Sequence, residues 1–138
     1  PEVYYVRQHM MDTGVDLCLD IHGDEGLPYC FATSNAGIPS FSRRLAMLEK
    51  EFTETWKKIS PDFQDEHGYE VDKPGQAKMG ICSKWVGENF DCLSLTIELP
   101  FKDNNNLTDS VYGWSPNRSK RFGASVLNVI LQMIERIG

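Results

Sequence analysis

The sequence lacks several features on which common functions depend. No apolar run approaches the ~20 residues that a membrane-spanning helix needs, so we expect no membrane partner. The 14 basic residues, against 20 acidic ones, form no stripe, which argues against a nucleic-acid partner because phosphate binding depends on clustered cations. A Ser/His/Asp triad context, a glycine-rich phosphate loop and a Cys/His nucleophile arrangement are missing as well.

Cysteine usage points to a reducing environment. The four cysteines, Cys18, Cys30, Cys82 and Cys92, form no CxxC pair, and a domain of 138 residues does not need disulfides to be stable. Cys18 within a predicted strand and Cys92 just before another are typical of small buried thiols. We therefore expect free structural thiols and a cytoplasmic location.

The chain begins at Pro1, without an initiator methionine or a leader, and its first residues already have a helical pattern. We expect a piece of a longer protein, so the lack of a signal peptide says little about export. With 41% apolar and 25% charged residues, the 138 residues suffice for one domain with a core of its own.

Two stretches alternate apolar and polar residues with the two-residue period of a strand that has one buried face. The first, 15–21, leads directly into His22, a glycine and two carboxylates. The second, 93–99, carries Glu98 near its end, where Pro100 removes the backbone donor that a central strand needs to continue. If both strands share a sheet and their polar faces coincide, His22 and Glu98 meet at one edge.

Three segments have the pattern of helices. Residues 1–11 begin with a proline suited to the first turn and stop before a glycine. A second helix is expected from a serine cap at position 40 or 42 to about position 59. A third is expected from a Ser-Pro start at 115 to the C-terminus, because its apolar residues keep a 3.6-residue period.

The segments between these elements are less regular. Residues 29–32 indicate a short strand within a loop rich in Gly, Pro, Asn and Ser, and 77–85 indicate another strand. Residues 62–76 are polar and predict a long surface loop, a kind of loop that often has a function. Together the elements predict an α/β domain with a mixed sheet flanked by helices.

His22 has the setting of a metal ligand. Zinc prefers imidazole and carboxylate ligands, and in a catalytic site three protein ligands leave one position for water. Asp20 projects from the same strand face and is a candidate outer partner of the imidazole, although side chains two residues apart start several ångströms from each other. A structural histidine is the alternative.

Glu98 lies in a strand whose neighbours are apolar, and a buried carboxylate needs a cation, a metal-bound water or a hydrogen-bond donor. Beside a zinc-bound water it would act as general base; an ion pair with a buried Arg or Lys is the alternative. Asp24 and Glu25 are weaker metal candidates, since a capping or loop role explains both. His67 and Glu70 have H-x-x-E spacing, but their polar loop indicates a chance match.

Four groups of residues, spread in order over nearly the whole chain, match one known family. They are Asp20-Ile21-His22-Gly23-Asp24-Glu25 with Pro28-Tyr29, then Trp85-Val86-Gly87, then Thr96-Ile97-Glu98-Leu99-Pro100-Phe101-Lys102-Asp103, and Gly113-Trp114-Ser115-Pro116. With these residues the chain resembles the zinc metallocarboxypeptidases of the M14 type, in particular the bacterial relatives of cytosolic carboxypeptidases.

The resemblance implies that His22 is the third zinc ligand of the family and that Glu98 is the general acid/base that activates the zinc-bound water. The implied cofactor is zinc, and the implied reaction is hydrolysis of the C-terminal bond of a peptide or protein. In the cytosolic subfamily the substrates are often acidic chain ends or glutamate branches. Many M14 enzymes place a tyrosine over the substrate; at the corresponding distance before Glu98 this chain has Gln76.

The chain departs from the family in one respect. The first two zinc ligands, from an H-x-x-E motif, and the arginines that clamp the substrate carboxylate lie upstream of the matched region. The resemblance therefore implies that 1–138 is the C-terminal part of the catalytic domain, which alone would bind zinc poorly and hydrolyse little. Two alternatives stay open: a non-catalytic domain of the same fold that binds a peptide or partner, and a metal-dependent phosphohydrolase that uses His22, Asp24 and Glu25.

Overall fold

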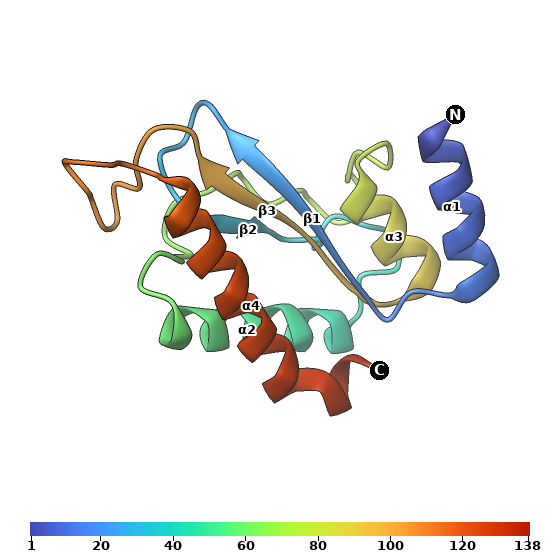
Figure 1. Cartoon of the computed structure of the whole chain (residues 1–138). Helices are drawn as coiled ribbons and strands as arrows, with labels where there is room; N and C mark the ends of the chain where they lie inside the picture. Colours follow the sequence, from blue (N-terminus) through green and yellow to red (C-terminus); the bar gives the residue numbers. More distant parts are fainter.

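The computed structural model describes all residues, 1–138, and contains four helices and three strands. In chain order they are α1 (Glu2–Thr13), β1 (Leu17–Asp24), β2 (Phe31–Thr33), α2 (Arg43–Ile59), α3 (Cys82–Phe90), β3 (Leu93–Pro100) and α4 (Pro116–Ile137) (Figure 1). The expected α/β fold with a mixed sheet flanked by helices is confirmed. None of the helices combines the length and the hydrophobicity that crossing a bilayer requires.

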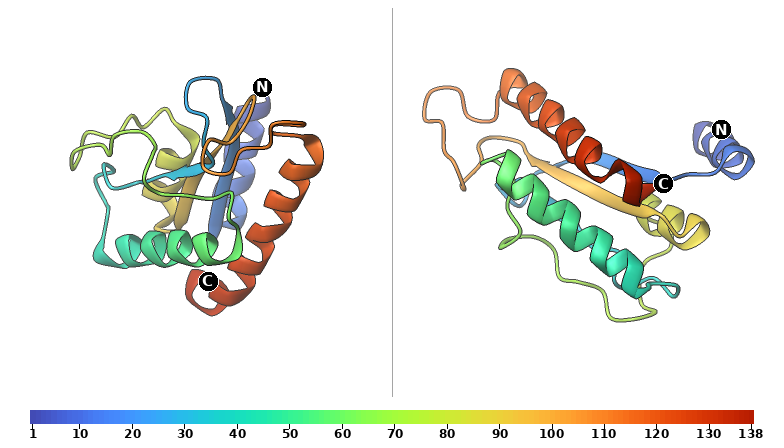
Figure 2. Two further views of the ribbon diagram at one scale, coloured as in Figure 1. Left: turned by 90° about the vertical axis from the view of Figure 1, so that its left-hand side faces the viewer. Right: turned by 90° about the horizontal axis from the view of Figure 1, so that it is seen from below.

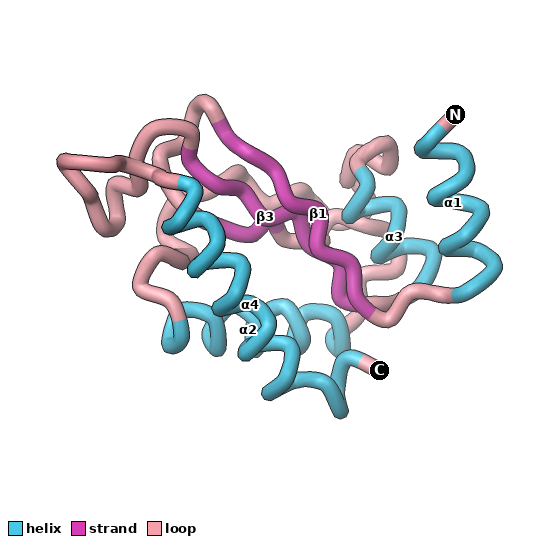
Figure 3. Tube along the Cα trace, in the orientation of Figure 1, coloured by secondary structure: helices cyan, strands magenta, loops and turns pink.

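The three strands, magenta in Figure 3, form one sheet in the order β1-β3-β2. Strand β3 is parallel to β1 and antiparallel to β2. The register of the parallel pair runs unbroken from Leu17 opposite Leu93 to Asp24 opposite Pro100. Since side chains alternate between the faces of a sheet, the even-numbered residues of both strands share one face. The outer edge of β1 pairs with no other strand.

The odd-numbered residues of β3 form one side of the hydrophobic core. Leu93, Leu95 and Ile97 are fully buried and belong to one cluster with residues of α2 and α4. Helix α3 packs on the opposite face, where the Ser83 hydroxyl lies 2.8 Å from that of Thr96. Figure 2 shows α3 and α4 on opposite sides of the sheet. The sheet is therefore apolar on the α2/α4 side and polar on the α3 side.

Trp56 joins the helices of the core. Its ring stacks on those of both Phe63, at a centroid distance of 4.5 Å, and Phe122, at 4.6 Å. Its indole nitrogen donates a hydrogen bond to the Ser125 hydroxyl at 2.7 Å. Because Trp56 lies on α2 and both Phe122 and Ser125 lie on α4, this one side chain fixes the two helices against each other.

The predicted strand at 77–85 is wrong, because the chain forms α3 from Cys82 onwards. The apolar residues before it alternate over too few positions to specify a strand, and the buried residues of 82–90 have helical spacing. Gly87 lets this helix approach the loop after β2, since a Cβ there would lie 2.4 Å from the Asn35 amide nitrogen. Asp91, with φ 46°, ends the helix in the left-handed region.

Two other expectations concern α1 and the cysteines. Helix α1 forms as predicted, and none of its residues is buried. All four cysteines are free, as expected; Cys30 and Cys92 are buried, Cys18 is half-buried and Cys82 is exposed. Of the two thiols expected to be buried, Cys92 is buried and Cys18 is buried only in part.

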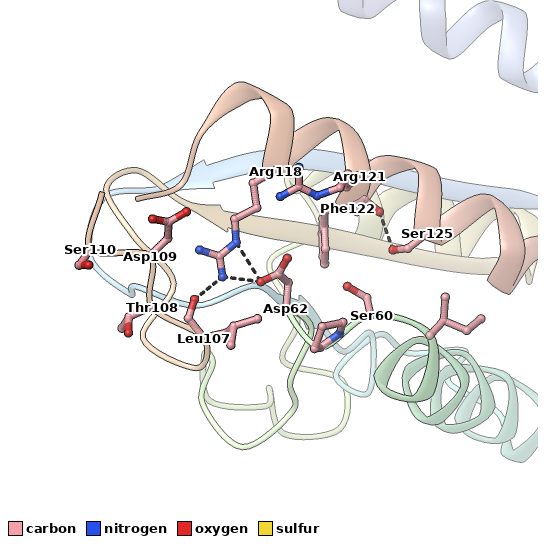
Figure 4. Close-up of a pocket in the computed structure, with 12 residues that line it drawn as sticks. Ser60, Asp62, Leu107, Thr108, Asp109, Ser110, Arg118, Arg121, Phe122 and Ser125 are labelled. Carbon is pink, nitrogen blue, oxygen red and sulfur yellow. Dashed lines mark hydrogen bonds and ion pairs between the residues drawn. The ribbon is translucent and has the colours of Figure 1, made fainter. Parts of the chain in front are cut away.

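Arg118, near the start of α4, makes a buried ion-pair network with the loops around it (Figure 4). Its Nε lies 3.0 Å from Asp62 Oδ1, its Nη1 lies 3.2 Å from Asp103 Oδ1, and its Nη2 donates to the Leu107 carbonyl. The guanidinium thus ties the loop after β3 and the segment after α2 to α4.

We expect Arg118→Met to lower the free energy of unfolding by about 3–5 kcal/mol, since Asp62 would be left as a buried carboxylate without its cation. Arg121→Met, an exposed position on the same helix, is the matched control and should change stability by less than about 0.5 kcal/mol. Urea unfolding of the two variants measures both values. Equal, small losses would show that the network contributes nothing.

Candidate active site

The ends of β1 and β3 bring the two principal site candidates together. His22 lies opposite Glu98 in the register, on the polar face of the sheet. His22 Nδ1 lies 3.6 Å from Glu98 Oε1, and the His22 side chain is 48% exposed whereas that of Glu98 is 7% exposed. The site therefore combines an accessible imidazole with a sheltered carboxylate.

Asp20 contacts the other side of the same imidazole. Its Oδ2 lies 3.1 Å from His22 Nε2. Residues two apart in a strand are about 7 Å apart at Cα, so the imidazole must lean back along β1 to make this contact. Each nitrogen of His22 thus faces a different carboxylate.

Glu98 has no Arg or Lys partner. The buried cation of this region, Lys84, lies 3.0 Å from Asp72 Oδ2 and donates to the Ser34 carbonyl. Burial raises the pKa of Glu98, His22 lowers it, and the nearby carboxylates raise it further. The alternative role of Glu98, an ion pair with a buried Arg or Lys, is therefore absent from the structure. Its raised pKa means that the carboxyl binds a proton more tightly than an exposed glutamate does.

A cavity of about 280 Å³ opens beside these residues. Its wall includes the loop after α2, which contributes a tyrosine that sequence reasoning missed. The residues that line it include His22, Tyr69, Lys78, Lys84 and Glu98. Gln76, which the family spacing singled out, does not line it. A cavity of about 580 Å³ next to Arg118 contains none of the predicted site residues (Figure 4).

Asp24 organises the rim of the cavity. Its Oδ1 accepts hydrogen bonds from the backbone nitrogens of Gly26, at 2.6 Å, and Leu27, at 3.2 Å, and its Oδ2 accepts one from the Tyr69 hydroxyl at 2.6 Å. Burial would raise the pKa of Asp24, but the hydrogen bonds from Tyr69 and the backbone outweigh it and lower the pKa. Asp24 is thus engaged in fixing the loop after β1 and the orientation of Tyr69.

Of the remaining candidates, Glu25 and His67 do not line the cavity beside this pair. Glu25 is exposed on the loop after β1. The His67 ring stacks on Tyr29 at a centroid distance of 4.3 Å, whereas Glu70 lines the cavity. No group of three or more His, Cys, Asp or Glu side chains has the arrangement of a metal site.

A buried carboxylate on α2 holds a segment that lines the cavity. Glu49 on α2 accepts hydrogen bonds from the Ser34 hydroxyl at 2.6 Å and from the Asn35 backbone nitrogen at 2.8 Å. These bonds hold the segment around Ser34 in place. The Ser34 carbonyl in turn accepts a hydrogen bond from Lys84. Burial raises the pKa of Glu49, although Ser34, Asn35 and Lys84 each lower it.

Proteins of known structure are similar to this chain in both sequence and fold. A metallo-carboxypeptidase from Pseudomonas aeruginosa, solved in complex with (2-guanidinoethylmercapto)succinic acid, is 43% identical, and its structure matches all of this chain with a TM-score of 0.97. A metallo-carboxypeptidase from Burkholderia cenocepacia is 44% identical over 98% of the chain, with a TM-score of 0.93. By sequence and by fold, the chain is similar over its whole length to these metallo-carboxypeptidases.

The similarity covers nearly all of this chain but only part of each relative. The chain spans 36% of the length of each of these two metallo-carboxypeptidases. It likewise covers 36% of an uncharacterised protein of Zymomonas mobilis, to which it is 39% identical over 137 residues. No family model matches the chain. It therefore corresponds to about a third of a protein of this kind.

The raised pKa of Glu49 predicts a pH effect on stability. Because the folded protein binds the Glu49 proton more tightly than the unfolded chain does, its contribution is fully present below the ordinary pKa of 4.5 and is lost as the pH rises through the folded value. We expect the stability of the wild type relative to Glu49→Gln to fall from acidic to neutral pH. Urea unfolding over that range measures it.

The control for this experiment is Glu54→Gln, an exposed position on the same helix. It should follow the wild-type pH dependence. A difference between wild type and Glu49→Gln that stays constant with pH would contradict the prediction.

Proposed function

We propose that this chain is the C-terminal part of the catalytic domain of an M14-type zinc carboxypeptidase, which hydrolyses the last peptide bond of a peptide or protein. The observation that carries the proposal is the pairing of His22 with Glu98 at one strand end, with 3.6 Å between Nδ1 and Oε1. The likeness to metallo-carboxypeptidases over the whole chain supports it.

His22 is the zinc ligand in this proposal. Its half-exposed imidazole, held at the end of a strand between two carboxylates, is chemically suited to zinc. When bound, zinc supplies a Lewis acid that polarises a carbonyl and lowers the pKa of water. The resemblance to the family places the other protein ligands upstream of the matched region, so we assign this chain one ligand of the set.

Glu98 is the general acid/base in this proposal. Its burial keeps bulk water away from the carboxyl, and its raised pKa suits a group that takes up and returns a proton. It removes a proton from the attacking water as the oxygen bonds to the scissile carbonyl carbon. When the C–N bond breaks, it delivers that proton to the leaving amine nitrogen.

The cavity of about 280 Å³ is the proposed site for the substrate's last residue. Tyr69, which lies in its wall with its hydroxyl oriented by Asp24, takes the place of the tyrosine that the family sets over the substrate. Lys78 lines the same cavity and forms no ion pair, whereas Lys84 is paired with Asp72. A free cation at this position favours an acidic side chain such as glutamate.

A ligand of one relative bears on the binding of carboxylates but not on the substrate's side chain, because it carries a cationic guanidino group beside its succinic acid group. The succinic acid group of the compound bound to the Pseudomonas aeruginosa protein carries two carboxylates. A site that binds a substrate carboxylate through cations accommodates such a group.

Glu98→Gln tests the catalytic role in a protein of the relatives' full length that carries this chain. We expect hydrolysis to fall by about 10²–10⁴-fold, the usual contribution of a general acid/base, while the zinc content stays unchanged. His22→Ala should instead lose zinc. Metal analysis beside a peptide-hydrolysis assay measures both, and hydrolysis retained by Glu98→Gln refutes the role.

The same assay separates the proposal from a non-catalytic domain of this fold. Such a domain would bind a peptide while showing no hydrolysis even when fully loaded with zinc. Hydrolysis by the wild type that is lost in Glu98→Gln excludes that function.

Lys78→Met tests the preference for acidic substrates. We expect its kcat/KM for peptides ending in Glu to fall by up to about fivefold relative to peptides ending in Leu, the factor that corresponds to an exposed ion pair of up to about 1 kcal/mol. Lys73→Met, on the same loop but outside the cavity wall, is the control. An equal change for both substrates would show that Lys78 does not recognise the acidic group.

A further inference from the structure

The His22 imidazole lies between two carboxylates that differ in distance and origin. Asp20 comes from the same strand, and its Oδ2 is 3.1 Å from Nε2. Glu98 comes from β3, and its Oε1 is 3.6 Å from Nδ1. By distance, only the contact with Asp20 is short enough for a hydrogen bond between nitrogen and oxygen.

A neutral imidazole carries its proton on one nitrogen and a lone pair on the other. The hydrogen bond made by the protonated nitrogen decides which nitrogen is left to bind a metal. A carboxylate on the far nitrogen also fixes the orientation of the ring and raises its basicity. The position of Asp20 thus has a direct consequence for the nitrogen on the side of Glu98.

We propose that Asp20 is a positioning residue: it accepts a hydrogen bond from His22 Nε2–H and so presents the Nδ1 lone pair to a metal ion on the side where Glu98 lies. This inference rests on the proposed function of His22 as a zinc ligand. Its consequence is that His22 Nδ1, the metal-binding nitrogen, and the Glu98 carboxyl, the general acid/base, are on the same side of the imidazole and close to the same metal position.

The Asp20 carboxylate is largely sheltered, since its side chain is only 26% exposed. Cys82, the first residue of α3, is a neighbour of both Cys18 and Asp20, and burial together with these neighbours raises the pKa of its thiol to about 11. The thiol is therefore a neutral neighbour of Asp20 that adds no like charge beside the carboxylate.

The tautomer of His22 can be measured on this chain without metal. The sequence contains 3 histidines, so the ring-nitrogen signals of His22 in a 15N NMR spectrum are assigned by their loss in His22→Gln. At a pH where the ring is neutral, we expect the wild type to carry the proton on Nε2. In Asp20→Ala the only remaining acceptor is Glu98, next to Nδ1, so the proton should move towards Nδ1.

Two variants serve as comparisons. Asp20→Glu keeps a carboxylate and should restore the wild-type tautomer. Asp16→Ala, an exposed aspartate just before β1, should leave the spectrum of His22 unchanged. If Asp20→Ala fails to fold, the wild type still decides, since a proton found on Nδ1 of the wild-type ring overturns the proposal. An unchanged tautomer in folded Asp20→Ala also overturns it.

The second readout is zinc affinity, measured with a chromophoric chelator in a protein of the relatives' full length. Loss of an outer carboxylate partner of a histidine ligand weakens metal binding by about 10–100-fold, so we expect this loss for Asp20→Ala and recovery in Asp20→Glu. If His22→Ala loses zinc while Asp20→Ala does not, only the role of Asp20 is wrong. If His22→Ala binds zinc as the wild type does, the proposed function itself fails.

Discussion

The parallel register between β1 and β3 is the constraint on which the site depends. It sets His22 opposite Glu98, and because side chains alternate along each strand, it also puts Asp20 on the same face. A slip of one residue would turn one of the two strands over and send its polar residues into the core. The burial of Leu93, Leu95 and Ile97 against α2 and α4 holds that register, so the core and the site are fixed by the same pairing.

The polar face of the sheet carries charges that the core could not accept. Glu98 is almost fully sheltered without an Arg or Lys partner, and the nearby Asp20, Asp24 and Lys84 have partners of their own. A buried charge without a partner destabilises a fold, and such costs concentrate at functional sites. The burial of Glu98 therefore makes this end of the sheet the candidate site of the chain.

Much of this arrangement follows from local patterns. The alternation around Leu17 to Ile21 and Leu93 to Leu99 predicted β1 and β3, and the serine caps predicted where α2 and α4 begin. The motif spacing predicted a relationship to carboxypeptidases that the comparisons confirm. Patterns failed for 77–85, where a short apolar alternation is compatible with either structure and tertiary packing around Gly87 selects the helix.

The sequence by itself determined the strands, the polar residues at their ends and the resemblance to carboxypeptidases, because these depend on spacing along the chain. Only the tertiary structure decided which side chains meet. The contact of Asp20 with His22 depends on the lean of one ring, and the place of Tyr69 in the cavity wall depends on how a long loop folds back onto Asp24. Neither has a periodic signal, since a loop and a rotamer are chosen by contacts with residues far away in the chain.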